Sequence, residues 1–210
     1  MPEKAAELLQ KPDICYNIRH FERHRRDLDD PWSCRQSAIH QKFYFANEHS
    51  KWIVVHPPLL FGESLKYIHP SQIAHPMGLH LQYLTAGAAN WNEYLNHISE
   101  KLAALDQKIS FPKSLKDFDV DFSFSQQVHV LRQKSSQAHF VLDNTIATVA
   151  SLKVLADKIA QIINLPSTVA DSFRAELENT SSELRRQLLT ARKLLLLSKD
   201  IKSMVTSALP

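Results

Sequence analysis

Hydrophobic and small residues in the second half of the chain recur at alternating spacings of three and four. In the first of two long segments within residues 124–209, this stripe comprises Val128, Leu131, Ser135, Ala138, Leu142, Thr145, Val149, Leu152, Ala156, Ile159 and Ile163. The second segment repeats the pattern less regularly, through Ala170, Phe173, Leu177, Thr180, Leu184, Leu188, Ala191, Leu195, Ser198, Ile201 and Val205. Such spacing is typical of a seam along which two helices pack. Because only Leu165-Pro166-Ser167 separates the segments, the pattern predicts a long antiparallel helical hairpin, similar to a coiled coil.

Residues 36–56 show the alternation of a β-hairpin instead. Ile39, Gln41, Phe43 and Phe45 fall on one side of the first strand, and the turn residues 47–50 lead to a second strand, Trp52 to Val55. The proline pair after residue 56 ends that strand, since proline cannot donate to a sheet ladder. The hairpin therefore predicts the centre of a small sheet.

The remaining segments give weaker patterns. Residues 2–10 favour a short helix, residues 14–21 are compatible with a strand or a helix, and residues 59–76 favour a loop with one short helical turn. From Met77 to Ile109 the spacing is helical, with a new helix beginning at Asn90. We expect an α+β fold with an α/β domain over residues 1–122, in which helices cover the sheet, and a helical hairpin or stalk over residues 123–210.

Composition and charge exclude several classes of protein. The hydrophobic content of 44% is sufficient for a core, and the lysines and arginines behind the net charge of +3 are scattered among acids, unlike a nucleic-acid-binding stripe. Two cysteines and no secretory signal peptide indicate a reducing, cytoplasmic location. The sequence contains no apolar run long enough to cross a membrane. Its three glycines fit no phosphate-binding loop.

No recognisable motif for catalysis is present. Neither Cys15 nor Cys34 has a neighbouring histidine of a nucleophile motif, and neither Ser33 nor Ser37 lies in a Gly-x-Ser-x-Gly elbow. We therefore expect a protein that is not an enzyme. An unrelated chemistry, built from residues that only the fold brings together, is the less favoured alternative.

Candidate metal ligands are carboxylates in two short acidic stretches and a pair of histidines. A small hard cation such as Mg²⁺ prefers oxygen ligands. The weak candidates are Asp117, Asp119, Asp121, Asp27, Asp29 and Asp30. The stretch around Asp117 lacks the glycine and the terminal glutamate of a calcium-binding loop, which favours a short edge strand there. If residues 20–30 are helical, His20 and His24 share a face with Asp27; the alternative is a solvated charged turn. No cofactor is expected with certainty.

A resemblance to a known family adds to this reading. The motifs that carry it are Pro31-Trp32-Ser33-Cys34-Arg35-Gln36, Trp52-Ile53-Val54, Leu79 to Leu84, Asn90-Trp91-Asn92-Glu93-Tyr94-Leu95, and the segment from Ala191 to Ser198 together with Met204. Together they resemble the soluble region of fungal CorA-like transporter-domain proteins. The resemblance implies an N-terminal α/β cytoplasmic domain followed by a stalk helix, within oligomeric Mg²⁺ channels. It covers most of the chain from about residue 14 onward.

One departure from the family leaves two alternatives. The family's two transmembrane helices, with a Gly-Met-Asn signature between them, are absent from these 210 residues, which end about where the first would begin. The sequence is either part of a longer protein, which a downstream segment would attach to a membrane, or a naturally soluble relative. In both cases we expect a CorA-like cytoplasmic domain with a regulatory or oligomerising role. A stand-alone coiled-coil interaction module is the other interpretation. Self-association or partner helices are expected along the hairpin, and residues 185–202 are candidates for contact with a membrane surface, because they are rich in lysine and arginine.

Overall fold

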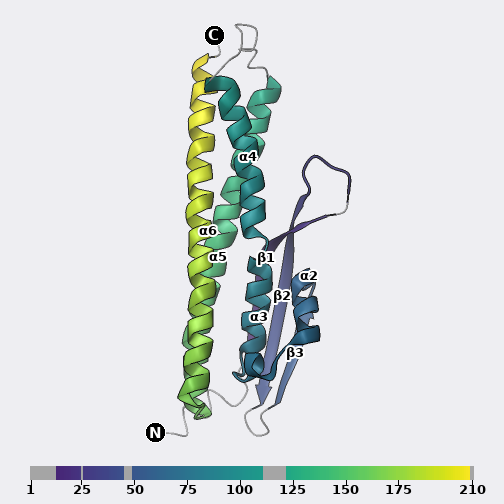
Figure 1. Ribbon diagram of the computed structural model, residues 1–210, viewed down its shortest axis with the longest axis vertical. Coiled ribbons are helices and arrows are strands. Elements are labelled where there is room, and N and C mark those ends of the chain that lie inside the picture. The colour runs from purple at the N-terminus through teal and green to yellow at the C-terminus, as the bar shows by residue number, and fades with distance from the viewer. Residues whose placement is uncertain (1–12, 25, 45–48, 111–121, 209–210) are drawn as a thin grey trace. The chain divides into compact units, whose positions relative to one another are not determined.

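A three-stranded antiparallel sheet is the centre of the N-terminal region. The computed structural model describes residues 13–24, 26–44, 49–110 and 122–208, and, within the last range, side chains as far as residue 204. The strands β1 (Asp13–Arg23), β2 (Trp32–Tyr44) and β3 (His49–Val55) lie side by side in the order β1-β2-β3 (Figure 1). The predicted hairpin is therefore confirmed as β2 and β3, in a register that pairs His40 with Ile53. The segment left open between strand and helix is the edge strand β1.

One face of the sheet is buried, and it is the face that the alternation of apolar residues in the sequence predicted. In β2 the side chains of Ser37, Ile39, Gln41 and Phe43 are buried, while the residues between them are half-buried. Because side chains of a strand point alternately to opposite faces, the pairing partners in β1 and β3 share this inner face. On the outer face, β3 leaves Ile53 and Val55 exposed to solvent.

Helical segments cover the inner face of the sheet. They are α2 (Leu59–Ser64), the short 3-10 turns η2 (Leu65–Tyr67) and η3 (Pro70–Ile73), and α3 (Gly78–Ala88). The expectation of a loop with one helical turn over residues 59–76 was therefore wrong, because three short helical pieces form there. Phe61 of α2 packs edge-on against Tyr83 of α3, with ring centroids 5.6 Å apart, so the two helices share one apolar contact.

The chain forms two compact units, each built from two segments of sequence. The first unit takes residues 1–89 and 145–182, and the second takes residues 90–144 and 183–210. The long helices α5 (Phe122–Ile162) and α6 (Ser167–Ala208) therefore each contribute a part to both units. The sequence-based division at residue 122 assigned both long helices to a domain of their own, whereas the units share them.

The two long helices form the predicted antiparallel hairpin. Within the first unit, Lys153 of α5 pairs with Glu178 of α6, and Asp157 pairs with Arg174. Residue numbers therefore increase along α5 as those of their partners on α6 decrease, which is the order of antiparallel helices (Figure 1). The break falls where it was expected, with α5 ending at Ile162 and α6 beginning at Ser167. Parallel helices would not give this order of pairs.

The predicted seam matches the buried residues closely in α5 and less closely in α6. All predicted seam positions of α5 from Val128 to Ile159 are buried, and Ile163, just beyond the helix, is half-buried. In α6 the buried positions are Phe173, Leu177, Ser181, Leu184, Gln187, Ala191, Leu194, Ser198 and Ile201. The predicted Thr180, Leu188 and Leu195 are half-buried instead. Each of these three is adjacent to a residue that is buried in its place, namely Ser181, Gln187 and Leu194.

The second unit has a core of its own around α4 (Trp91–Ser110). Its buried residues, Trp91, Tyr94, Leu95, Ile98, Leu102 and Leu105, are those that the helical spacing predicted. The same unit buries Ser135, Ala138 and Leu142 of α5 and Leu184 and Ala191 of α6. Small residues on a seam allow helices to approach closely, which is consistent with their complete burial here. No helix in the part of the chain that the structure describes is long and apolar enough to cross a membrane.

Candidate functional site

The inner face of the sheet carries a buried hydrogen-bond network centred on Gln41. The side-chain nitrogen of Gln41 donates to the carbonyl oxygen of Pro76 at 3.0 Å and to the hydroxyl oxygen of Ser50 at 3.2 Å. The side-chain oxygen of Gln41 lies 2.9 Å from Nε2 of His80. Since both Gln41 and His80 are 1% exposed, the bond between them forms away from water. The network therefore connects β2 and β3 to the segment that enters α3.

These contacts fix the tautomer of His80. A carbonyl oxygen only accepts, so the Gln41 amide nitrogen must face Pro76, which turns the amide oxygen toward His80. Nε2 of His80 therefore carries the proton and donates it, and Nδ1 accepts from the hydroxyl of Tyr16 at 3.1 Å. Burial lowers the pKa of His80 to about 3. The ring is thus neutral at physiological pH, and the network holds no net charge.

A second pair of hydroxyls lies beside this network. The hydroxyls of Ser37 and Tyr83 are 2.7 Å apart, and both residues are buried. Burial raises the pKa of Tyr83 to about 12, with the bond to Ser37 acting in the opposite direction. Burial is also the main reason that the pKa of Tyr16 is raised. Tyrosines with raised pKa values remain protonated and act as hydrogen-bond donors, so this face of the sheet is a neutral structural connection between β1, β2 and α3.

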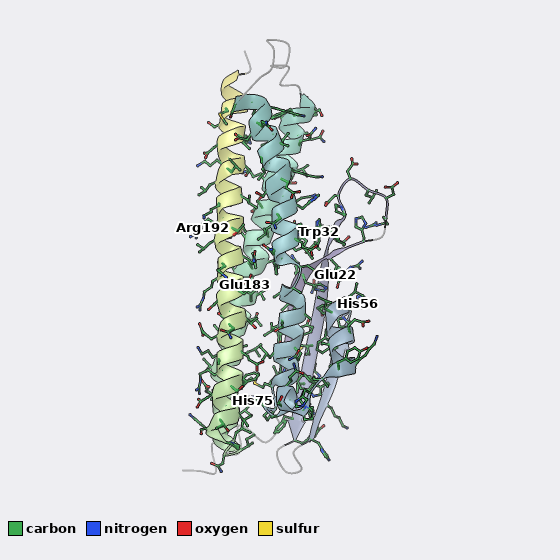
Figure 2. The ribbon with its side chains drawn as sticks, in the orientation of Figure 1. Glu22, Trp32, His56, His75, Glu183 and Arg192 are labelled. Carbon is green, nitrogen blue, oxygen red and sulfur yellow. The ribbon has the colours of Figure 1, made fainter. Side chains whose placement is uncertain are left out.

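An ion cluster lies at one end of the sheet, around the buried carboxylate of Glu22. One oxygen of Glu22 accepts a hydrogen bond from the backbone nitrogen of Leu59 at 2.8 Å, at the first residue of α2, and lies 3.4 Å from Nε2 of His20. The other oxygen lies 3.2 Å from Nε of Arg35. Glu22 and Trp32 come from the adjoining ends of β1 and β2 (Figure 2). The carboxylate therefore joins two strands to the start of α2.

His20 occupies a different environment from the one considered in the sequence. The hypothesis that His20, His24 and Asp27 share a helical face is wrong, because His20 lies in β1 and no helix follows it. His20 is 1% exposed, and burial lowers its pKa, partly offset by the neighbouring Glu22. The imidazole is part of the Glu22 cluster. The charged block at residues 26–30 is instead a connection between β1 and β2, as the alternative interpretation of a charged turn predicted.

The carboxylates considered for metal binding are placed in two parts of the chain. Asp27, Asp29 and Asp30 lie in the connection between β1 and β2, where Asp30 accepts a hydrogen bond from the backbone nitrogen of Trp32 at 3.3 Å. Among the described residues, no group of three or more His, Cys, Asp or Glu side chains is placed to hold a metal ion. Asp117, Asp119 and Asp121 lie outside those residues. The assignment of a metal site to either set stays a prediction.

The surface of α6 carries an exposed stripe opposite its buried seam. Arg185, Leu189, Arg192, Leu196 and Lys199 follow one another at spacings of four and three and are all exposed. Leu189 is 57% exposed and Leu196 is 56% exposed. The side chain of Arg192 is labelled on α6 in Figure 2. The stripe, which we call the basic-leucine stripe, alternates basic and apolar residues.

Comparison with known protein families identifies one family that is similar to part of this chain. Residues 10–110 match the family described as CorA-like transporters. Over these residues, which are slightly less than half of the chain, the protein is similar to the CorA-like transporters. The CorA-like region covers the sheet, the helical segments on its inner face and α4, and thus contains the Gln41 network and the Glu22 cluster. No curated protein matches the chain.

Sequence reasoning missed the buried polar residues more than any other feature. Gln41 was placed correctly on the apolar side of β2, and a glutamine in such an alternation was the available signal for a buried hydrogen-bond network. The partners of Gln41, His80 and Pro76, are distant in sequence, so their proximity follows only from the fold. The burial of His20 and Glu22 had no comparable signal, because their neighbours at residues 23–30 are mostly charged.

Proposed function

We propose that this CorA-like protein is a cytoplasmic domain with a regulatory or oligomerising role in divalent-cation transport, with Mg²⁺ as the cation concerned. The match of residues 10–110 to the family is the observation that carries the proposal. The neutral network on the sheet and the absence of a recognisable nucleophile motif in the sequence support a role without catalysis. The domain then acts through binding and assembly.

The basic-leucine stripe supports assembly through α6. Leu189 and Leu196 lie seven residues apart, and each is more than half exposed. Burying two leucine side chains is favourable by roughly 1.5 to 3 kcal/mol each. A second copy of the chain, or a helix of another protein, would bury both leucines if it packed along this side of α6. Assembly of that kind is what an oligomerising role requires.

The test is the oligomeric state of the protein in solution. Sedimentation velocity over a range of protein concentrations should detect association of the unmodified chain, and the double substitution Leu189→Glu with Leu196→Glu should abolish it. The matched control is Val154→Glu, at an apolar residue of α5 that is 56% exposed and belongs to the first unit. Association that survives the double substitution would contradict the use of this stripe, and a chain that stays monomeric throughout would contradict an oligomerising role.

Contact with a membrane surface is a second candidate function, favoured by the charge of α6. Between residues 183 and 202 the helix carries six basic residues and two acidic ones; the basic residues are Arg185, Arg186, Arg192, Lys193, Lys199 and Lys202. Each basic residue near an anionic lipid surface contributes about 1 kcal/mol, and salt screens the attraction. Ordinary solubilising charge on an exposed helix face is the competing explanation.

Vesicle sedimentation distinguishes these two explanations. If the basic residues serve a membrane surface, the protein should sediment with phosphatidylserine vesicles at low salt, much less at high salt, and little with phosphatidylcholine vesicles. Replacing Arg192 and Lys193 by glutamine should reduce the bound fraction at low salt. Equal and negligible sedimentation in every condition would leave the charges with a solubilising role only.

Mg²⁺ binding is the part of the proposal that depends on carboxylates. Isothermal titration calorimetry with Mg²⁺ should detect binding, and it should be lost when Asp117, Asp119 and Asp121 are replaced together by asparagine or, alternatively, when Asp27, Asp29 and Asp30 are. Asparagine keeps the side-chain size but removes the negative charge that a hard cation prefers. The absence of both heat and a thermal shift at millimolar Mg²⁺ would remove cation sensing from this domain.

A further inference from the structure

The first unit contains a pocket of about 590 Å³ between the sheet and the turn that joins α5 to α6. Its lining comes from β2, β3, the segment around η3, α3 and the turn itself. Among the described residues the lining comprises Phe43, Ser50, Trp52, Ile68, Ile73, Ala74, His75, Pro76, Leu79, Ile163, Asn164, Leu165 and Pro166. This volume lies within the range of about 300–1,000 Å³ that is usual for small-molecule sites.

The pocket has a buried floor and an exposed rim. Phe43 and His75 are 4% and 3% exposed and form part of the floor. His75 is held in place because its ring stacks on Phe173 of α6, with centroids 4.0 Å apart and an angle of 10° between the planes. Ile73, Asn164 and Pro166 are exposed at the rim. Because stacking and hydrogen bonding hold these side chains in place, the floor of the pocket has its shape before any ligand binds.

The pocket carries no formal charge. None of its lining residues is an aspartate, glutamate, lysine or arginine. Burial lowers the pKa of His75, its single titratable group, to about 4, although a hydrogen bond to the backbone of Ala156 and the charge of Asp157 act in the opposite direction, so the ring is neutral near pH 7. Asp157 does not line the pocket and is paired with Arg174. Nδ1 of His75 accepts a hydrogen bond from the backbone nitrogen of Met77 at 3.1 Å, which also favours the neutral ring. A charged ligand would lose its hydration here without gaining an opposite charge.

Two polar groups remain available at the edge of this apolar surface. The hydroxyl oxygen of Ser50 accepts from Gln41, which leaves the hydroxyl hydrogen to be donated. The side-chain amide of Asn164 is exposed, at a residue whose φ of 50° belongs to the tight turn between the helices. One hydrogen-bonding group of a ligand could therefore be held while its apolar part rests on Phe43 and Trp52.

We propose that this pocket binds a neutral small molecule that consists of a flat, largely apolar ring system with one hydrogen-bonding group. The aromatic side chains Phe43 and Trp52 supply the surface for the ring system, and Ser50 or Asn164 pairs with the polar group. Because the lining includes both the sheet and residues 163–166, the bound molecule joins the tip of the helical hairpin to β2 and β3. This binding goes beyond the proposed function and does not depend on cation transport or on oligomerisation.

The test uses N-phenyl-1-naphthylamine, a neutral ring compound whose fluorescence rises in apolar sites. Titration of the full chain should give saturable binding, and neutral 1-naphthalenemethanol should displace the probe at least tenfold better than 1-naphthoate, which carries a carboxylate on the same rings. Ile73→Asp, at the rim, should weaken probe binding at least tenfold. Ala74→Trp, which fills the pocket without adding charge, should weaken it similarly.

The control is Ile53→Asp, at an isoleucine on the outer face of the sheet. Ile53 is 60% exposed and Ile73 46% exposed, so both substitutions leave the core intact, and circular dichroism checks the fold of each variant. Ile53→Asp should bind the probe as the unmodified chain does. Probe binding that is not saturable, that is unchanged by both Ile73→Asp and Ala74→Trp, or that naphthoate displaces as well as the neutral alcohol would overturn the proposal.

Discussion

Replacing Gln41 by leucine should destabilise the first unit by about 1–4 kcal/mol. The substitution keeps the size of the side chain but removes the acceptor of His80 Nε2 and the donor to the carbonyl of Pro76. Leaving the buried Nε2 of His80 without an acceptor costs roughly 1–3 kcal/mol, and the carbonyl of the half-buried Pro76 adds less than that. The additional apolar surface of leucine offsets a part of that loss. Reversible urea unfolding, followed by tryptophan fluorescence, measures the change.

A double-mutant cycle separates the hydrogen bond from the general effect of substitution. When His80→Leu is combined with Gln41→Leu, the donor and its acceptor disappear together, so the double variant should lose at least about 1 kcal/mol less than the two single losses added. Gln36→Leu is the matched control, because Gln36 is an exposed glutamine of the same strand. Its effect should stay within about 0.5 kcal/mol.

Two results would refute this reasoning. If Gln41→Leu unfolds at the same urea concentration as the unmodified chain, the network does not stabilise the sheet. If the effects of Gln41→Leu and His80→Leu simply add, the two side chains do not form the hydrogen bond that their 2.9 Å separation indicates.

Three further predictions follow from burial and close contacts. Gly78→Ala should lower the melting temperature strongly, because an added Cβ would lie 2.2 Å from the carbonyl oxygen of Gln72. Gly62→Ala, where an added Cβ meets nothing within 4 Å, should be neutral or slightly stabilising. Equal effects of the two substitutions in thermal melts would contradict this prediction. Leu142→Asp, at a fully buried seam position, should lower the free energy of unfolding by several kcal/mol, so the helical circular dichroism signal should be lost at a lower temperature than in the unmodified chain. Phe140→Asp, at a 60% exposed position, should leave that temperature unchanged. The free energy of unfolding should fall as the pH drops from about 6.5 toward 4. In the folded state the pKa values of His75 and His80 are lowered to about 4 and about 3, so these histidines stay neutral over this range, whereas in the unfolded chain they bind protons. Above about pH 7.5, where the unfolded histidines are also neutral, they should contribute almost no pH dependence. Urea midpoints that are unchanged between pH 7 and 5 would argue against their burial as neutral groups.

Regular packing could be predicted from this sequence, whereas pairings between distant residues could not. The seam of α5 follows from a periodicity that depends only on helix geometry, so Val128 to Ile159 were identified correctly. The inner face of β2 follows similarly from a period of two. The status of β1 stayed open because its short apolar pattern fits both a strand and a helix. Only pairing with β2, which binds the whole strand from Asp13 to Arg23, decides it.

The candidate sites were harder to predict for the same reason. The pocket combines residues of the hairpin with the turn at residues 163–166, more than a hundred positions later. The Glu22 cluster likewise joins Arg35 and the backbone of Leu59. No spacing rule connects such residues. By contrast, the exposed leucines of α6 could have been found from the sequence, because Leu189 and Leu196 are one heptad apart on the side opposite the seam.

The sharing of α5 and α6 between two units limits how this chain can be divided into fragments. The family match ends at residue 110, but the first unit also needs residues 145–182, which supply Ala156 and Phe173 around His75. A gene fragment cut at the family boundary would leave that histidine exposed and the first unit incomplete. A recombination event between residues 110 and 145 would likewise separate segments that fold as one unit.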